Sequence, residues 1–239
     1  MSDYHYPGDE LQIFSHAVRW KSYWSSRLRK YVKGDVLDVG AGQGNNLEFL
    51  LDAPCHSWTA LEPDAALLQK TIARGAISQD PRLKWVTGTT ADLLAQSPLP
   101  QYDSIIYIDV LEHIEDDEPE FQRAARLLRP GGHLIVLSPA FQFLYSPFDK
   151  AIGHFRRYER PTLSRLSAPG LTQEKLFFLD SAGFMLSAAN RMLLRQSMPT
   201  EKQIKFWDTW VIPVSRIIDP VLARGFGRSI IGIWKKAAS

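Results

Sequence analysis

Short apolar runs alternate with segments of helical periodicity along most of this chain. Apolar residues spaced about 3.6 positions apart predict a helix from about Glu10 to Tyr31. Downstream of it, five short apolar runs have the length expected of buried strands. These predicted strands are Asp35–Val39, Ser57–Glu62, Leu83–Thr87, Ser104–Ile108 and His133–Ser138.

Helical segments separate several of these strands. We predict helices at Asn45–Leu51, from about Asp64 to Ile77 and at Asp116–Leu128, with Arg129–Gly132 (RPGG) ending the last of them. Strands and helices that alternate with short connections form right-handed βαβ units, which build a parallel sheet covered on both faces. The pattern therefore predicts an α/β fold with a doubly wound, mainly parallel sheet.

The C-terminal part adds two further strands. A short helix after Pro161 leads to a predicted strand at about Lys175–Leu179, and Ser229–Trp234 is predicted to be the last strand. The residues between these two strands have a predominantly helical pattern. Three prolines are expected to break it, at positions Pro199, Pro213 and Pro220.

We expect one domain over residues 1–239, because no repeat or low-complexity linker divides the chain. Residues 1–33 would form a helical cap, and residues 181–228 a helical insertion before the last strand. The apolar stripe of this insertion is typical of a core or of a homodimer face, and a lid over an apolar substrate is the alternative. The stripe comprises Phe206, Trp207, Trp210, Val211, Val214, Ile217 and Ile218.

The composition narrows the class of protein. A hydrophobic fraction of 45% with 23% charged residues is typical of a globular protein. The formal charge of +2 is too small to indicate a nucleic-acid partner, and a single cysteine, Cys55, excludes an internal disulfide framework. The acidic N-terminus does not resemble a signal peptide, and no apolar run reaches the roughly 18 residues of a membrane span. We therefore expect a cytoplasmic protein without stable membrane insertion.

A glycine-rich turn, Asp38–Gly44 (DVGAGQG), follows the first predicted strand. Glycines at a turn from strand to helix let a ligand approach the backbone and leave amide groups of the helix pointing at it. A dinucleotide-binding turn would have a glycine at the position of Asn45. The carboxylate of Asp38 would repel a diphosphate, whereas it suits a ligand with an amino group and a positively charged sulfur.

Glu62 ends the second predicted strand, where a carboxylate can accept hydrogen bonds from both hydroxyls of a ribose. Structural roles are the alternatives: Asp38 could brace the loop, and Glu62 could cap the helix after Pro63. The two acids together, at the ends of alternating strands, favour a nucleoside ligand over two separate structural roles.

The motif series VLDVGAGQGNN, ALEP, IIYIDVLEHIED and LLRPGGHLIVLSP resembles the class I S-adenosylmethionine-dependent methyltransferases, over at least Asp35–Pro139. The resemblance implies a seven-stranded sheet with an antiparallel last strand, and S-adenosyl-L-methionine as the cofactor, which leaves as S-adenosyl-L-homocysteine. Many relatives have an acid at the position of Thr89, so Asp92 is the alternative contact for the adenine. The cofactor residues expected from the resemblance are Asp38, Gly40, Ala41, Gly42, Asn45, Glu62, Pro63, Thr89, Asp92, Asp109 and Val110.

The first helix would close the other side of this cofactor. Tyr23 and Trp24 lie near its end, just before the glycine-loop strand, and we expect Tyr23 to contact the cofactor. Packing of both side chains against the sheet is the simpler alternative.

The turn after the fourth strand carries two proton acceptors, Glu112 and His113. In class I methyltransferases the histidine of such a turn can instead shape the cofactor pocket without a catalytic role. Some quinone-pathway relatives hold a divalent metal with acid and histidine residues here. Because only two candidate ligands are evident, we expect no metal.

A long aromatic loop follows the fifth strand and contains GHFRRY at Gly153–Tyr158. Long loops are usually functional or disordered, and this loop is too aromatic for disorder. It resembles a bacterial subgroup with PAF…LYSPxD…GHxRRY, which includes indole C3-methyltransferases of natural-product pathways. The resemblance implies an acceptor pocket with Phe141, Tyr145, Asp149 and Arg157 as binding residues, and His154 and Tyr158 as catalytic candidates beside Glu112 and His113.

Simpler roles exist for parts of this loop. His154 could pin the loop to a carbonyl, Tyr158 could be a core residue with a satisfied hydroxyl, and Arg156 is expected in a surface ion pair.

The sequence therefore favours methyl transfer to a small-molecule acceptor, aromatic and indole-like, with a proton acceptor near the methyl group. Modification of a tRNA or of a protein side chain is an alternative, disfavoured by the small net charge. A metal-assisted, quinone-type O-methyltransferase is another. A non-catalytic binding protein and a nicotinamide-dependent dehydrogenase are further competitors, and Asn45 and Asp38 disfavour the dehydrogenase.

Overall fold

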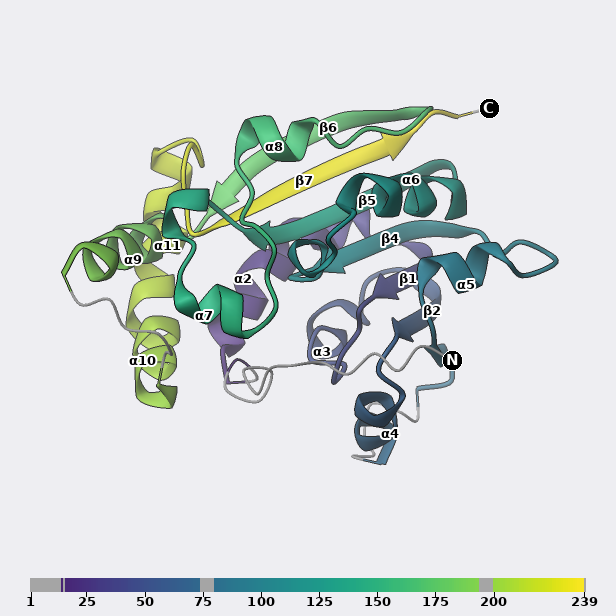
Figure 1. Cartoon of the computed structure of the whole chain (residues 1–239), viewed down its shortest axis with the longest axis horizontal. Helices are drawn as coiled ribbons and strands as arrows, with labels where there is room; N and C mark the ends of the chain where they lie inside the picture. The colour runs from purple at the N-terminus through teal and green to yellow at the C-terminus, as the bar shows by residue number, and fades with distance from the viewer. Residues whose placement is uncertain (1–13, 15, 74–79, 194–199, 239) are drawn as a thin grey trace.

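The structure is a computed structural model that describes residue 14 and residues 16–73, 80–193 and 200–238. A seven-stranded sheet with the strand order β3-β2-β1-β4-β5-β7-β6 forms its centre (Figure 1). The strands are β1 (Gly34–Val39), β2 (Cys55–Glu62), β3 (Leu83–Thr87), β4 (Tyr102–Ile108), β5 (Leu128–Pro139), β6 (Leu171–Leu179) and β7 (Ser229–Lys236).

The direction of the strands confirms the predicted architecture. Strands β1 to β5 pair in parallel, whereas β7 runs antiparallel to both β5 and β6. Every predicted strand is present. Strand β5 begins earlier than expected, because Leu128 already pairs with Tyr102 before the register shifts, so Arg129–Gly132 ends the helix but belongs to the strand.

Helices connect the strands. In the first half of the chain the helices are α2 (Val18–Leu28), η1 (Arg29–Tyr31), α3 (Leu47–Leu50), α4 (Ala65–Ala73), α5 (Thr90–Leu94), η3 (Leu111–His113) and α6 (Asp117–Leu127). The others are η4 (Gln142–Leu144), α7 (Pro147–Ala151), α8 (Arg160–Ser164), α9 (Ser181–Leu193), α10 (Glu201–Phe206), η5 (Trp207–Val211) and α11 (Ile212–Val221). The first predicted helix is described from Val18 onward, and residues 10–13 and 15, like residues 74–77, lie outside the described residues.

Two apolar cores lie on opposite faces of the sheet. One core joins α2 and α3 with the insertion and includes Trp24, Leu50 and Ile204. The other joins α6 and α8 with the opposite face and includes Phe121 and Leu163. Figure 1 shows α2 behind the strands and α6 and α8 in front of them. This arrangement is the doubly wound α/β architecture expected from the alternation of elements.

The insertion is more continuous than predicted. Pro213 lies in the first turn of α11, where its missing N–H costs least, and Pro220 lies inside the last turn of the same helix. The expectation that these two prolines break the helical pattern was therefore wrong, and Pro199 lies outside the described residues. Trp207 is buried by this insertion, whereas its other face exposes Phe206, Trp210, Val214, Ile217 and Val221. A homodimer through that face stays a prediction.

None of the helices in the described part of the chain combines the length and the apolar character needed to cross a bilayer.

Candidate active site

Two adjoining cavities lie beyond the carboxyl ends of the parallel strands. The larger has a volume of about 610 Å³ and is lined by the glycine loop, by Glu62 and by the start of α5. The smaller has a volume of about 170 Å³ and lies between α2, α7 and the loop after β5. In open α/β sheets ligands bind at this edge, where the strand order reverses between β1 and β4. The residues that line both cavities are Phe14, Lys21, Asn46, Ile108, Asp109 and His113.

The glycine loop forms one wall of the larger cavity. Gly40 and Gly42 have positive φ angles of 65° and 55°, a region that side chains disfavour. A Cβ atom on Gly40 would also lie 2.8 Å from both γ-carbons of Val110. Glycine is therefore required at position 40 for both conformation and space. The predicted residues Gly40, Ala41, Gly42, Asn45 and Val110 all line this cavity.

Glu62 is a buried carboxylate at the end of β2 that also lines the larger cavity. Its Oε2 accepts the Gly42 N–H at 2.8 Å, and its Oε1 accepts the Asp64 N–H at 2.9 Å. Burial raises the pKa of Glu62. Each carboxylate oxygen retains a second lone pair, so Glu62 can brace the loop and still accept two ribose hydroxyls. Pro63, the next residue, lines the cavity as well.

Asp38 is the least expected feature of this region. Its side chain is only 1% exposed and lies behind the glycine loop, so it does not line the cavity directly. Neither carboxylate oxygen has a hydrogen-bond partner among the described residues. Burial raises the pKa of Asp38 to about 7. A buried carboxylate without a partner is costly, and such strain is typical of a functional site.

The far end of the larger cavity is formed by Thr89 and its neighbours. Asp92 does not line it: its Oδ2 accepts the Thr89 N–H at 2.8 Å and the Thr89 hydroxyl at 2.7 Å. This is a reciprocal cap at the start of α5. Asp92 therefore holds the helix whose first residues bound the cavity, and a contact between Asp92 and the cofactor stays a prediction.

Asp109 lies where the two cavities meet. It follows β4 with a φ angle of 55°, an uncommon conformation for a residue other than glycine. Asp109 is exposed and lines both cavities, and desolvation by the surrounding protein raises its pKa to about 7. Arg228 and Arg157 oppose that shift by favouring the ionised form. The backbone conformation therefore directs an acid to the point where the two spaces join.

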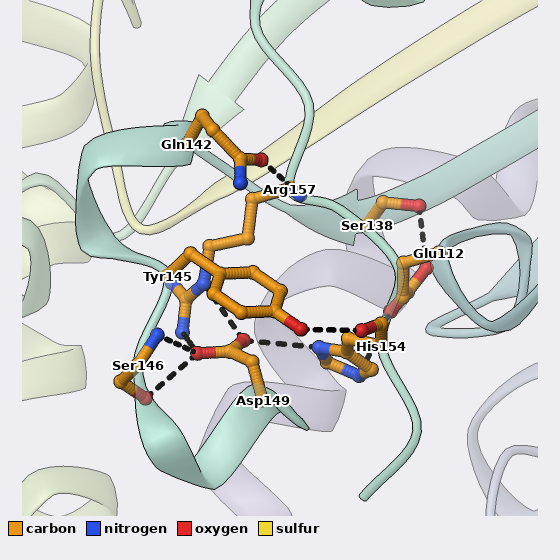
Figure 2. Close-up of polar contacts among 8 residues, drawn as sticks. All are labelled: Glu112, Ser138, Gln142, Tyr145, Ser146, Asp149, His154 and Arg157. Atoms are coloured by element: carbon orange, nitrogen blue, oxygen red, sulfur yellow. Dashed lines mark hydrogen bonds and ion pairs between the residues drawn. The ribbon is translucent and has the colours of Figure 1, made fainter. Parts of the chain in front are cut away.

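The loop after β5 is organised by Asp149, which is fully buried (Figure 2). Arg157 donates to it through Nε at 2.8 Å and through Nη2 at 3.0 Å, and Ser146 donates its N–H and its hydroxyl at 2.8 Å each. Burial alone would raise the pKa of Asp149, but the bonds from His154, Arg157 and Ser146 hold it well below its usual range. This ionised carboxylate fixes both the histidine and the second arginine of GHFRRY.

His154 connects this loop to the turn after β4. Its Nδ1 lies 3.0 Å from Asp149 Oδ1, and its Nε2 lies 3.8 Å from Glu112 Oε1. The ionised Asp149 favours the tautomer with the proton on Nδ1, which leaves the lone pair of Nε2 on the side of Glu112. His113 packs edge-on against His154, with ring centroids 4.5 Å apart. All three side chains on this side, Glu112, His113 and His154, line the smaller cavity.

Glu112 and His113 are both strongly desolvated. Glu112 is fully buried, accepts the Ser138 hydroxyl at 2.8 Å through Oε2, and has a pKa raised well above its usual value, chiefly by burial and then by Asp109. Burial and the neighbouring His154 lower the pKa of His113 to about 3. Desolvation therefore favours the neutral form of both side chains.

Besides Asp38 and Asp92, four predicted site residues line neither cavity. The Tyr158 hydroxyl donates to Asp117 Oδ2 at 2.7 Å, and the Tyr145 hydroxyl donates to the His154 carbonyl at 2.6 Å. Phe141 stacks on Phe178 with ring centroids 5.0 Å apart, and the Tyr23 hydroxyl donates to Asp219 Oδ2 at 2.8 Å. The structure thus gives these four side chains packing and positioning contacts outside the cavities. The expected roles of Tyr158 in catalysis, of Tyr145 and Phe141 in acceptor binding and of Tyr23 in cofactor binding stay predictions.

Several residues of the smaller cavity were missed from the sequence. Arg228 belongs to the segment before β7, and Phe148 and Ile152 come from α7 and its end. Trp20 and Lys21 come from α2, where only helical periodicity was visible. Trp207 and Trp24 were weighed as a lid residue and a cofactor cover, respectively, and both line the smaller cavity. Arg156, as expected, forms an ion pair with Asp117, at 2.6 Å.

Comparisons with known proteins agree with this geometry. A family model described as a methyltransferase domain matches residues 37–134, which contain the glycine loop, Glu62, Asp109 and the turn after β4. A ubiquinone biosynthesis O-methyltransferase of Xylella fastidiosa (strain 9a5c) is 36% identical over 104 residues, which cover 42% of this chain and 40% of that protein. The chain thus spans less than half of the length of that relative.

Longer matches extend over most of the chain at lower identity. A demethylmenaquinone methyltransferase of Tropheryma whipplei (strain Twist) is 29% identical over 185 residues, which cover 72% of each chain. The structure of coclaurine N-methyltransferase bound to N-methylheliamine and S-adenosylhomocysteine superposes with a TM-score of 0.59 at 14% identity, over 92% of this chain and 72% of that one. The fold is that of the Rossmann-like methyltransferases. At the level of sequence, residues 37–134 are similar to a methyltransferase domain.

Proposed function

We propose that the protein transfers the methyl group of S-adenosylmethionine to a small-molecule acceptor held in the smaller cavity. The observation that carries this proposal is the junction of the two cavities, which share Ile108, Asp109 and His113. A cofactor in the larger cavity would present its sulfonium methyl group at this junction. Methyl transfer needs in-line alignment of donor and acceptor, and two cavities that meet at one point supply it.

The cofactor would lie along the glycine loop. Gly40–Gly42 leave room for its methionine end, Glu62 is oriented to accept the ribose hydroxyls, and Thr89 bounds the adenine end. The ammonium group at the methionine end of the cofactor would be the missing partner of the Asp38 carboxylate. It would reach Asp38 directly after a small movement of the loop, or through a bridging water.

The acceptor is an aromatic, indole-like molecule in this proposal. Aromatic side chains line the smaller cavity, and planar rings pack favourably against them. When the methyl group bonds to an acceptor carbon or nitrogen, the positive charge that develops is removed by loss of a proton. His154 would take that proton on Nε2, because Asp149 orients its ring and stabilises the cation that forms.

Two measurements test this function. Calorimetry with S-adenosylhomocysteine and with NAD separates the cofactor classes: we expect binding of the former alone. A screen of aromatic acceptors with methyl-labelled S-adenosylmethionine then identifies the methylated product. Failure of S-adenosylhomocysteine to bind, or labelling of bulk tRNA or protein in place of every small molecule, would contradict the proposal.

A second candidate is metal-assisted O-methylation of a quinone-type phenol. It is favoured by one observation: ligand atoms of Glu112, His113 and His154 lie within 4.8 Å of one another. Two imidazoles and one carboxylate suit a divalent transition metal, which would lower the pKa of a bound phenol. Loss of turnover on chelation with EDTA, restored by Zn²⁺ or Mn²⁺, would favour this candidate, whereas turnover unaffected by EDTA would exclude it.

A further inference from the structure

Arg228 occupies an unusual position in the wall of the smaller cavity. It immediately precedes β7, its side chain is half-buried, and its guanidinium carbon lies 4.9 Å from the centre of the Trp207 ring. Its backbone is fixed on both sides, because its N–H donates to the Asp180 carbonyl at 3.0 Å and its carbonyl accepts the Ala140 N–H at 2.9 Å. The fixed backbone of Arg228 and the Trp207 ring therefore hold the guanidinium at this wall.

The guanidinium of Arg228 has no hydrogen bond or ion pair with any residue that the structure describes, in contrast to Arg157. Arg157 forms two bonds with Asp149, which also engages His154. Asp180 contributes the strongest attraction to Arg228 without touching it. The carboxylate of Asp180 is already occupied by Trp207 Nε1 at 2.8 Å, by a serine hydroxyl and by a backbone N–H.

A half-buried cation that no carboxylate contacts directly is a costly arrangement, although Asp180, Asp149 and Asp109 attract it from a distance. An arginine remains charged at every pH of interest, and burial of a charge is tolerated where a partner compensates it. Asp109 faces the same cavity but lies at the junction with the cofactor space, and Glu112 is fully buried against Ser138. The five donors of Arg228 are thus available to a molecule that enters the cavity.

The remaining walls define the shape of that molecule. Besides Arg228, five aromatic side chains line the smaller cavity, together with the charged side chains of Lys21, Asp109, Glu112, Asp149 and Arg157. Its volume of about 170 Å³ is close to the roughly 150 Å³ of an engineered apolar cavity that binds benzene. One compact ring system fits there, with an opening toward the cofactor cavity. The ring-bearing residues are Phe14, Trp20, Trp24, Phe148 and Trp207.

We propose that Arg228 is an acceptor-binding residue that pairs with a carboxylate, so that the acceptor is a compact aromatic acid. This inference rests on the proposed function and specifies its substrate class. The carboxylate would bind the guanidinium at the β7 side of the cavity, while the ring packs among the tryptophans. Because Asp109 and His113 lie at the cofactor side, the reacting atom belongs to the end of the ring system opposite the acid.

The test compares matched acids and amides. Indole-3-acetate and phenylacetate are titrated into the protein saturated with S-adenosylhomocysteine, alongside indole-3-acetamide and phenylacetamide, with binding followed by ligand-observed NMR. We expect each acid to bind roughly tenfold or more tightly than its amide, because hydrogen bonds to charged groups are among the stronger ones. Equal affinities of acid and amide, or no binding of either series, would overturn the inference.

Variants test whether the Arg228 side chain causes the preference for acids over amides. R228M is expected to lose the preference for acids, and R228K to retain part of it. R216M is the matched control, because Arg216 is also half-buried in the insertion and stacks over a ring, 5.2 Å from the centre of Tyr23, but lines neither cavity. An unchanged preference in R228M, or its loss in R216M, would contradict the assignment.

The affinity for S-adenosylhomocysteine separates the two proposals. If the wild-type protein does not bind it, the proposed function fails. If the cofactor product binds normally and acids have no advantage over amides, only the inference about Arg228 fails. Calorimetry of R228M with S-adenosylhomocysteine also verifies that the variant is folded, and R228K supplies the comparison should R228M not fold.

Discussion

Nδ1 of His154 lies 3.0 Å from Oδ1 of Asp149, and the same carboxylate is held by Arg157. These contacts explain the structural role of the GHFRRY segment. The two bonds from Arg157 keep Asp149 ionised, and the ionised acid in turn orients the imidazole toward the smaller cavity. Within this segment, Arg157 stabilises the acid that positions His154.

The first prediction concerns this pair. H154Q should lower kcat about 10²- to 10⁴-fold if the imidazole accepts the acceptor's proton. D149N should lower kcat as well, because an amide no longer stabilises the cationic ring. Steady-state kinetics with the acceptor found by screening measures both effects. Calorimetry should show an unchanged affinity for S-adenosylhomocysteine in each variant, and near-normal turnover of H154Q would refute the proton-acceptor role.

The second prediction compares two acids near the cofactor cavity. E62Q should weaken S-adenosylhomocysteine binding roughly tenfold or more, because an amide NH₂ must then face either the Gly42 N–H or the Asp64 N–H. D92N is the control, since Asp92 caps α5 without lining the cavity. We expect its affinity to stay within about threefold of the wild type, because a cap affects helix stability more than the ligand. Similar losses in both variants would contradict the assignment of Glu62 to the ribose.

Local patterns account for what the sequence predicted well. The seven strands were recognised because each is a short apolar run. The glycine loop was recognised because its closely spaced glycines come directly after β1. The placement of Gly40, Glu62 and Asp109 at one edge follows from the rule that parallel strands end on the same side. These features depend on neighbours in the sequence or on a topology with few alternatives.

The direction of individual side chains could not be predicted in this way. Tyr158 and His154 lie four positions apart in one irregular loop, yet only His154 faces the cavity. Irregular backbone has no period from which to infer the buried side. Arg228 and Trp207 reach the site from the insertion and its end, far along the chain, so only tertiary packing brings them to α2.

The third prediction follows from the hydrogen bond between the Tyr158 hydroxyl and Asp117. Y158F should lower the free energy of unfolding by about 1 kcal/mol, because Asp117 loses a partly buried hydrogen bond. Its kcat should remain close to that of the wild type, since Tyr158 lines neither cavity. Urea denaturation and steady-state kinetics measure the two effects. A large loss of kcat with unchanged stability would favour the catalytic role that the sequence suggested.

The last prediction concerns the pH dependence of stability. The pKa of Asp38 is raised from 3.8 to about 7 by burial, so the folded state binds a proton more tightly than the unfolded state. Stability from this group is fully present below about pH 4 and is lost as the pH rises through 7, with an upper bound of roughly 4 kcal/mol. D38N should therefore gain stability relative to the wild type between pH 5 and pH 8, as measured by urea denaturation.

A matched variant in the same strand fixes the sign of this effect. The pKa of Asp35 is lowered by its bond from Ser57, which outweighs burial, and by Arg129, so D35N should lose stability relative to the wild type as the pH rises. Saturating S-adenosylhomocysteine should reduce the pH dependence of the wild type, because its amino group favours the ionised form of Asp38. D38N should bind this ligand more weakly although it is the more stable protein. Parallel pH profiles of D38N and wild type would show that Asp38 is not the titrating group.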